Sequence, residues 1–441
     1  MIILVKSWQH TARGTALLVL GEVFDHDAYS NLALTKTLSG STLTKQDKAL
    51  VTELVYGTLA RKITLEWYLA HYIEDRDKLD SWVYHILLVS LYQLIYLDRL
   101  PAHAVVNEAV QLAKAKRTHA EGYVNAILRK VVGSSLPDIQ SIKRLNKRYS
   151  VQYSLPVWLI KVLIEDYGET RAFAIFESLA QRNKASVRVT RPDQLREVAE
   201  ATGSEQSLLS PVGLTKPSGH FASSDYFKEG LITIQDETSQ LVAPVMRLEG
   251  HEQVLDACAA PGGKTVHMAS YLTSGHITAL DLYDHKLALI RENALRLGVS
   301  DKIETKQWDA RKVHDLFGAD HFDKILVDAP CSGIGLIRRK TDIRYKKELS
   351  DFQSLQKIQL EILDSVCQTV KKGGIITYST CTIVHHENFQ VIQQFLASHP
   401  EFEQVMLDHP QRDIMVDGCL LVTPELYMTD GFFIAQLRRK F

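Results

Sequence analysis

The sequence predicts a multidomain protein with an all-helical bundle, then a small α+β module and then a larger α/β domain. Apolar residues recur at helical spacing through residues 12–132, whereas strand-like and helix-like segments alternate from about residue 250. With 441 residues, the chain also exceeds the size of a single ordinary core. We expect the three parts to cover residues 1–145, 146–235 and 236–441.

The first part shows helical spacing without any alternating strand pattern. Leu50, Leu54 and Leu59 repeat in this way. The apolar stretch Trp82–Leu97 is shorter than a membrane span and is interrupted by polar residues, so we interpret it as a buried helix. A compact helical bundle is the simplest structure for these segments, which are completed by 104–112 and 123–132.

The end of the bundle is basic. Between residues 114 and 148, nine positive residues stand against Glu121 and Asp138, an excess of nine minus two, or +7. Such a run is typical of a solvated helix surface followed by a linker, here expected near 133–150, but it also suits a surface that faces phosphates. The positive residues are Lys114, Lys116, Arg117, Arg129, Lys130, Lys143, Arg144, Lys147 and Arg148.

Mixed patterns characterise the next part. Helical patterns at Val157–Tyr167 and Ala172–Ala180 precede a predicted strand at Ser186–Thr190 and a helix near Asp193–Ala201. The segment Gly203–Phe221 is rich in Ser, Gly and Pro, so loops are predicted there. These features indicate a small α+β module.

The last part alternates apolar runs with helical stretches, notably Asp284–Leu297 and Leu355–Val370. This alternation predicts a mostly parallel sheet with helices on both faces. A late strand, Gly431–Leu437, suits an edge or inserted position. The other predicted strands are Gln253–Cys258, His276–Leu282, Ile303–Trp308, Asp323–Val327 and Gly374–Tyr378.

The composition limits the classes of protein to which the chain can belong. It is 45% hydrophobic and 23% charged, as in globular proteins, and the net charge of -1 does not by itself indicate a polyanionic partner. The chain start has no signal-cleavage pattern, so secretion is not expected. Five cysteines without a CxxC pair argue against a disulfide framework or a zinc site and favour the reducing cytoplasm. Thiols are therefore available as nucleophiles.

A strand followed by a small-residue turn marks the first candidate site, at Cys258, Ala259, Ala260, Pro261, Gly262, Gly263 and Lys264. The two glycines let the backbone approach a ligand at the carboxyl end of the strand, where a helix begins. Gly263-Lys264-Thr265 matches the end of a P-loop, but Cys258 stands where the first P-loop glycine is required. An adenosine cofactor without a phosphate chain is therefore the better match than ATP.

Carboxylates end four successive predicted strands, at Asp256, Asp281, Asp309 and Asp328. One such aspartate alone would be interpreted as a turn or helix cap. Four at one sheet edge form a rim, and Asp281 has the spacing of a residue that binds ribose hydroxyls. The rim supports the prediction of an adenosine cofactor.

Two cysteines, Cys331 and Cys381, also follow strand ends. Most cysteines are inert packing residues, but these two project to the edge that carries the carboxylates. A thiolate that adds to carbon 6 of cytosine lets carbon 5 attack a methyl sulfonium, after which a base removes the carbon 5 proton and the thiol leaves. The residues alone do not decide which cysteine attacks. Asp328 could hydrogen-bond the N3/N4 edge of the base.

A basic stretch at 337–347 follows Cys331 in the sequence, and Asp342 is its one acidic residue. Backbone phosphates need neutralising where a base is presented, so this position favours a nucleic-acid substrate over a merely solvated face. The predicted RNA-binding residues are Arg338, Arg339, Lys340 and Arg344.

At these residues the sequence resembles the RNA cytosine-5 methyltransferases of the NOL1/NOP2/Sun group, in particular its bacterial 16S rRNA branch called Sun or Fmu. The resemblance spans nearly the whole chain, with mild departures at Thr190, Thr341 and Thr382. AHAVVNEAVQLAK (102–114) and GYVNAILRK (122–130) resemble the NusB-like RNA-binding domain of this subgroup. The other matching motifs are DACAAPGGKT (256–265), DAPCSG (328–333), YSTCT (378–382) and DGFF (430–433).

The resemblance implies a Rossmann-like class I methyltransferase domain that binds S-adenosyl-L-methionine through Cys258 to Lys264, Asp281, Asp309 and Asp328. It also implies Cys381 as the nucleophile and Cys331 as the thiol that assists product release. We expect 16S rRNA as the partner, neither DNA nor a membrane, no metal, and a monomer in the cytoplasm. The alternatives are 5-methylcytosine formation in tRNA or 23S rRNA, methylation of protein or a base nitrogen, and a non-catalytic RNA-binding assembly factor.

Overall fold

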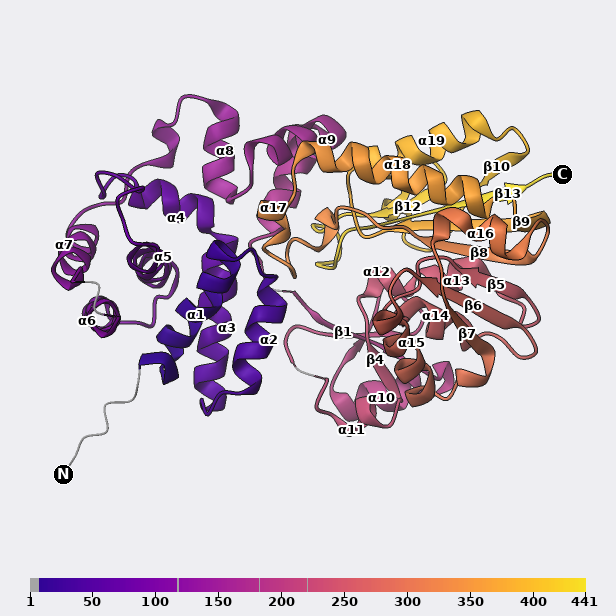
Figure 1. Cartoon of the computed structure of the whole chain (residues 1–441), viewed down its shortest axis with the longest axis horizontal. Coiled ribbons are helices and arrows are strands. Elements are labelled where there is room, and N and C mark those ends of the chain that lie inside the picture. The colour runs from indigo at the N-terminus through magenta and orange to yellow at the C-terminus, as the bar shows by residue number, and fades with distance from the viewer. Residues whose placement is uncertain (1–7, 117–118, 182, 220) are drawn as a thin grey trace. The chain divides into compact units, whose positions relative to one another are not determined.

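The computed structural model describes residues 8–116, 119–181, 183–219 and 221–441 (Figure 1). The chain divides into two compact units, of which the first comprises residues 1–165 and 340–346 and the second 166–339 and 347–441. The expected boundaries 1–145, 146–235 and 236–441 stay predictions, and the contacts group the chain as follows. Residues 146–165 belong with the bundle, and the small α+β module shares a unit with the larger sheet.

The regular elements of the first unit, among its described residues, are all helices, as predicted. Helix α9 continues from it into the second unit, and α17 comes from the separate segment 340–346. The elements are η1 (Trp8–His10), α1 (Ala12–Asp25), α2 (Ser30–Ser39), α3 (Lys45–Ala60), α4 (Lys62–Leu69), α5 (Ser81–Tyr96), α6 (Ala102–Ala115), α7 (Glu121–Val132), η2 (Ile139–Ser141), α8 (Leu145–Tyr153), α9 (Val157–Ser178) and α17 (Ile343–Lys346).

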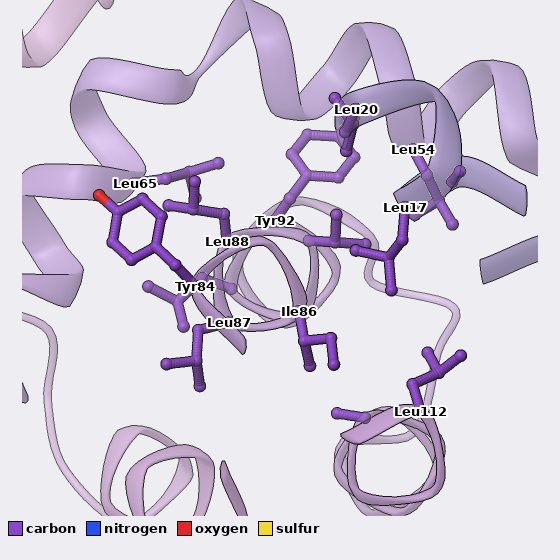
Figure 2. Packing of buried hydrophobic residues seen from close by; sticks show 14 of the residues in the cluster. Leu17, Leu20, Leu54, Leu65, Tyr84, Ile86, Leu87, Leu88, Tyr92 and Leu112 are labelled. Carbon is purple, nitrogen blue, oxygen red and sulfur yellow. The ribbon is translucent and has the colours of Figure 1, made fainter. Parts of the chain in front are cut away.

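Helix α5 lies at the centre of this bundle, with side chains of the neighbouring helices packed around it (Figure 2). It is apolar on nearly all sides, and every residue from Trp82 to Gln93 is buried. Asp80 caps its start by accepting hydrogen bonds from the backbone N–H groups of Trp82 and Val83. The predicted buried helix is confirmed. Among the surrounding side chains are Leu17, Leu54, Leu65 and Leu112.

The expected linker near 133–150 contains the start of helix α8, which sequence patterning did not indicate. The backbone N–H of Ile63 donates to Ser154 Oγ (3.0 Å), and the Thr64 hydroxyl donates to the Val151 carbonyl. These contacts attach α8 to α4. Tertiary contact therefore holds a polar helix that would be marginal in isolation.

A four-stranded antiparallel sheet, of order β2-β3-β1-β4, opens the second unit. Strands β2 and β3 lie inside the segment predicted to be loops, whereas β1 matches its prediction within one residue. Gly168 has φ +73° and separates the two predicted helices inside α9. The elements are β1 (Ala185–Val189), η3 (Pro192–Gln194), α10 (Leu195–Thr202), β2 (Glu205–Gln206), β3 (Gly213–Lys216), α11 (Asp225–Lys228) and β4 (Ile232–Ile234).

The larger sheet has the order β11-β12-β13-β9-β8-β5-β6-β7, with β10 paired to β13. Strands β7, β6, β5, β8 and β9 run parallel, and the rest are antiparallel, so the sheet is mixed. The predicted late strand is β13, which is inserted between β9 and β12. The strands are β5 (Gln253–Asp256), β6 (His276–Asp281), β7 (Ile303–Gln307), β8 (Phe322–Asp328), β9 (Val370–Thr380), β10 (Phe402–Val405), β11 (Met415–Val416), β12 (Cys419–Val422) and β13 (Phe432–Arg439).

Helices cover both faces of this sheet. Leu255 packs with α18 and α19, whereas its neighbour Val254 packs with α13 and α14 on the opposite face. The chain order reverses between β5 and β8, which is where ligands bind in such sheets. The helices are α12 (Glu237–Gln240), α13 (Val242–Met246), α14 (Gly263–Ala269), α15 (Asp284–Arg296), η4 (Ser300–Lys302), η5 (Ala310–Lys312), α16 (Val313–Phe317), η6 (Ile334–Leu336), α18 (Leu349–Val366), η7 (His385–Glu387), α19 (Phe389–Ser398) and η8 (Arg412–Ile414).

Candidate active site

The small-residue turn leaves β5 at the reversal point and leads into α14. The Ala259 N–H donates to the Leu280 carbonyl (2.8 Å), which fixes the turn against β6. Gly262 has φ +98°, and a Cβ there would lie 3.0 Å from the Ile290 Cα atom. A side chain at this position would be both strained and crowded.

The four strand-end carboxylates converge on this turn. Burial raises the pKa of the Cys258 thiol well above its usual range, and Asp256, Asp328, Asp281 and Asp309 raise it further, in that order. All four carboxylates therefore act electrostatically on one residue of the turn. Strands β5, β6 and β8 end in Asp256, Asp281 and Asp328, and β5 pairs in parallel with both of the other two.

This set of acceptors fits S-adenosylmethionine. The cofactor carries ribose hydroxyls, an adenine amine, an ammonium and a positive sulfonium, all of which suit an acidic edge. Asp281 is mostly buried and accepts from the Tyr283 N–H (3.1 Å), so its carboxylate is held in place. Asp309 is paired with Arg311 (2.7 Å), and Arg311 lowers the pKa of Asp309, so a cofactor contact there would share the carboxylate with that arginine.

Asp328 receives two hydrogen bonds, from Lys264 Nζ (2.7 Å) and from Ser379 Oγ (2.8 Å). Burial acts to lower the pKa of Lys264, but Asp328 and then Cys381 outweigh it, so the pKa is raised. Lys264 therefore remains charged and joins the cofactor turn to Asp328 and Cys381. The sequence placed Lys264 and Asp328 in the site without indicating that they pair.

The two cysteines meet. Cys331 Sγ and Cys381 Sγ lie 3.3 Å apart, because β8 and β9 are adjacent parallel strands with Asp328 opposite Ser379. The hydrogen bond with Cys381 raises the pKa of Cys331 well above its usual range, and burial adds to this. Cys331 therefore keeps its proton and can donate it in a hydrogen bond to the Cys381 sulfur.

The DGFF motif supports the loop that carries Cys381. The Gly431 N–H donates to the Gly335 carbonyl (2.8 Å), and the Gly335 N–H donates to the Cys381 carbonyl (3.1 Å). A Cβ on Gly335 would lie 2.1 Å from the Gly431 oxygen, so only glycine fits this crossing. Burial, followed by Asp236, raises the pKa of Asp430 to about 7.

The predicted RNA-binding arginines are engaged by acceptors within the protein. Arg338 is buried with its guanidinium on the carbonyls of Pro424 and Thr429, and Arg339 bridges Asp236 (2.8 Å) and Asp430 (3.2 Å). Arg338 is therefore buried on protein acceptors, whereas Arg339 is partly exposed but is engaged by two carboxylates.

Arg344 lies in the first unit and is 1% exposed, with hydrogen bonds to the carbonyls of Ala60 (3.2 Å) and Ser154 (3.1 Å). Its guanidinium is therefore held by protein acceptors, and this burial gives no support to its predicted contact with RNA. Lys340 is exposed, so its role in RNA binding stays a prediction. Burial and specific pairing of the arginines cannot be seen in a run of basic letters.

The basic run at the end of the bundle is different, since most of it is exposed. Arg148 is half-buried, and Arg117 lies outside the described residues. This run therefore offers the positive surface that the buried arginines do not. The exposed members are Lys114, Lys116, Arg129, Lys130, Lys143, Arg144 and Lys147.

Comparison with known proteins identifies the families that two parts of the chain match. Residues 243–438 match the family described as 16S rRNA methyltransferase RsmB/F, and residues 10–133 match the NusB family. A probable ribosomal RNA small subunit methyltransferase B from Bacillus subtilis is 39% identical over 98% of this chain and 99% of its own length. The ribosomal RNA small subunit methyltransferase B of Serratia proteamaculans is 32% identical over 97% of this chain and 98% of its own.

A solved structure, of a methyltransferase homolog protein from Pyrococcus horikoshii, aligns with a TM-score of 0.58 and 26% identity. It covers 68% of this chain and 100% of that chain. Together with the acidic edge and the thiol pair, these matches confirm the methyltransferase fold and the helical NusB domain expected from the sequence. The chain belongs to the 16S rRNA methyltransferase RsmB/F family of S-adenosylmethionine-dependent enzymes and carries a NusB-family domain at its N-terminal side.

Proposed function

We propose that this protein forms 5-methylcytosine in 16S rRNA, with Cys381 as the attacking thiol. The observation that carries the proposal is the pair of sulfur atoms 3.3 Å apart, beside the Lys264–Asp328 pair and the cofactor turn. Methylation of a protein or of a base nitrogen requires no such thiol pair. The names of the relatives, ribosomal RNA small subunit methyltransferase B, support the substrate.

Attack begins at Cys381. Its thiolate adds to carbon 6 of the cytosine, and the electron pair of the C5–C6 double bond moves toward carbon 5. The positive charge of Lys264 nearby favours the thiolate. S-adenosylmethionine, when bound, supplies an electrophilic methyl group to carbon 5. Asp328, fixed by Lys264 and Ser379, accepts a hydrogen bond from the N4 amine of the base.

Release depends on Cys331. The carbon 5 proton leaves to a base, the C5–C6 double bond re-forms, and the bond from carbon 6 to sulfur breaks, which returns Cys381 as a thiolate. Cys331 keeps its proton and lies 3.3 Å from the departing sulfur, so its S–H group stabilises the leaving thiolate. We therefore assign Cys331 to product release.

The exposed basic run at the end of the bundle, defined above, and Lys340 are the proposed contacts with RNA phosphates. We further propose that the enzyme acts as a monomer in the cytoplasm. In the described residues, no helix is long and apolar enough to cross a membrane.

Bisulfite sequencing of total RNA from a strain lacking this gene tests the reaction and the substrate together. The expected result is the loss of one 5-methylcytosine from 16S rRNA, restored by the wild-type gene and not by a Cys381→Ala gene. Loss from tRNA or 23S rRNA instead would contradict the proposed substrate. Unchanged 5-methylcytosine in all RNA would favour a non-catalytic assembly factor.

A further inference from the structure

Glu387, which the reaction above does not use, is a fully buried carboxylate between the two cysteine loops. Its Oε1 atom accepts hydrogen bonds from the Ser332 N–H (2.8 Å) and from Gln359 Nε2 (3.2 Å), and its Oε2 atom accepts from the Ser332 hydroxyl. Ser332 directly follows Cys331. Glu387 therefore holds the Cys331 loop through both the backbone and the side chain of one residue.

The same residues reach the other thiol. Ser332 Oγ lies 3.1 Å from Thr382 Oγ1, and Thr382 directly follows Cys381. Gln359 Nε2 also donates to the carbonyl of Pro330, which precedes Cys331 (2.9 Å). The residues on both sides of Cys331, and the one after Cys381, thus share a single hydrogen-bond network centred on Glu387.

The position of Glu387 is itself fixed. Its backbone carbonyl accepts a hydrogen bond from the Tyr378 hydroxyl of β9 (2.8 Å). The next residue, Asn388, donates to the Thr382 carbonyl (2.9 Å) and accepts from the Thr380 hydroxyl, which brackets Cys381 on both sides. The turn that contains Glu387 is therefore attached to the strand end from which the nucleophile projects.

Burial of the Glu387 carboxylate removes a charged group from water and therefore costs free energy. Burial raises the pKa of Glu387, while Ser332, Gln359 and Thr382 lower it through hydrogen bonds. These hydrogen-bonding partners are neutral groups, so no opposite charge among them offsets the burial. A role in holding the geometry accounts for the carboxylate, since its two oxygens accept three hydrogen bonds, two from Ser332 and one from Gln359 of α18.

We propose that Glu387 is a positioning residue, which holds the sulfur atoms of Cys331 and Cys381 in the relative placement that covalent turnover requires. This inference rests on the proposed cysteine chemistry. Misplacement of a reacting group by about 1 Å can lower a rate about 100-fold, so loss of Glu387 should act on chemistry more than on RNA binding.

Kinetics of Glu387 variants test the proposal. Glu387→Ala should lower kcat about 100-fold while KM for rRNA stays within about twofold. Glu387→Gln should stay within about tenfold of wild type, because its oxygen still accepts from the Ser332 N–H and its amide can donate to hydroxyls that rotate. The matched control is Glu403→Ala, which removes a partly exposed carboxylate of β10 that is paired with Arg438 of β13. Full activity of Glu387→Ala would overturn the proposal, as would a Glu387→Gln variant as slow as Glu387→Ala, because the carboxylate charge would then matter.

A second measurement reads the thiol placement without RNA. Diamide oxidises two adjacent thiols to a disulfide, taking two electrons and two protons and becoming the hydrazine, and peptide mass spectrometry then quantifies the Cys331–Cys381 link. Wild type and Glu403→Ala should link at one rate, and Glu387→Ala and Ser332→Ala at least several-fold more slowly. Equal rates in folded variants would overturn the proposal. Should Glu387→Ala not fold, Ser332→Ala decides, since it removes only one hydroxyl.

The two proposals fail differently. If wild type forms no covalent adduct with RNA that contains 5-fluorocytosine, the proposed function fails, while the diamide result still decides whether Glu387 places the thiols. If wild type forms the adduct and Glu387→Ala forms it equally fast, the positioning role fails and the proposed function stands.

Discussion

Cys331 and Cys381 follow two hydrogen-bonded parallel strands, yet their surroundings differ. The pKa of Cys331 is raised by its hydrogen bond with Cys381 and by burial, which keeps it protonated. Cys381 interacts electrostatically with the charged Lys264. These differences support the assignment of attack to Cys381 and release to Cys331, which the positions of the residues in the sequence did not separate.

Substitution of each thiol should therefore give a different outcome. Cys381→Ala should abolish turnover and adduct formation, whereas Cys331→Ala should accumulate a covalent protein–RNA adduct, because addition proceeds and elimination stalls. A denaturing gel with labelled rRNA and S-adenosylmethionine shows the adduct as a shifted band. Normal turnover by Cys331→Ala would contradict its role in release, and full activity of Cys381→Ala would contradict the covalent mechanism.

The buried carboxyl group of Asp256 leads to a prediction of how the stability of the fold depends on pH. Burial raises the pKa of this carboxyl to about 7, although the Thr265 hydroxyl hydrogen-bonds it (2.7 Å). A folded-state pKa above the unfolded value means that stabilisation by the proton is complete below about pH 4 and is lost as pH rises toward 7. The free energy of unfolding should lose up to about 1.4 kcal/mol per pH unit in that window from this group.

Asp256→Asn should flatten this dependence, because the amide cannot ionise. The unfolding midpoint of the full chain, measured from pH 4 to 8, provides the comparison, with the exposed Asp193→Asn as the matched control. An unchanged pH slope in Asp256→Asn would show that another group dominates the window.

At the scale of elements, the sequence predicted the parallel strands because each is an apolar run between turn residues. Strands β10, β11 and β12 were not predicted, since runs of two to four residues, such as Cys419–Val422, are too short to show a period. Strands β2 and β3 lie in a segment rich in turn residues, and their pairing with β1 comes from tertiary contact. Most of the antiparallel strands could thus not be predicted from the sequence.

The site was predictable for a related reason. Residues that follow parallel strands must share an edge, so the positions of Asp256, Asp281, Asp328 and the two cysteines could be inferred from strand ends alone. Partners could not. The pairing of Lys264 with Asp328 joins residues 64 positions apart, and Glu387 carries no motif-like spacing to Ser332. The burial of Arg338 and Arg344 could not be inferred, because the sequence gives charge but not burial.

Helix α2 supplies a prediction of its own. Asp342 accepts hydrogen bonds from the Ser30 N–H (3.2 Å) and the Ser30 hydroxyl (2.7 Å), so it caps this helix from a distant part of the chain. Asp342→Ala should destabilise the first unit by about 1–2 kcal/mol. Thermal unfolding of the full chain, with Asp351→Ala at α18 as a control in the second unit, should show a lowered transition for Asp342→Ala in the first unit. An unchanged midpoint would mean that water replaces this cap without cost.

At the scale of the whole molecule, the net charge of -1 conceals the local basic run at the end of the helical bundle. Exposed lysines that contact phosphates make binding depend on salt, because each contact releases condensed counterions. The composition therefore says little about RNA binding, and the placement of charge says more.

Replacing Lys114, Lys130, Lys143 and Lys147 with glutamine should weaken rRNA binding and reduce the slope of log Kd against log salt by up to about 3. Filter binding at salt concentrations from about 50 to about 300 mM measures this slope for each variant. A control variant with glutamine at the exposed Lys78, Arg196, Lys228 and Lys357 should keep the wild-type slope. Equal losses in both variants would mean that binding is not localised to the basic run.

The short segment 340–346, which belongs to the first unit, also bears on the order of events during synthesis. The ribosome delivers residues 1–165 first, but the capping carboxylate of Asp342 and the buried Arg344 emerge only after about 175 further residues. At roughly 5–20 residues per second, the first unit waits about ten seconds or more for its last piece. The docking of 340–346 therefore makes completion of the first unit depend on translation of much of the methyltransferase domain.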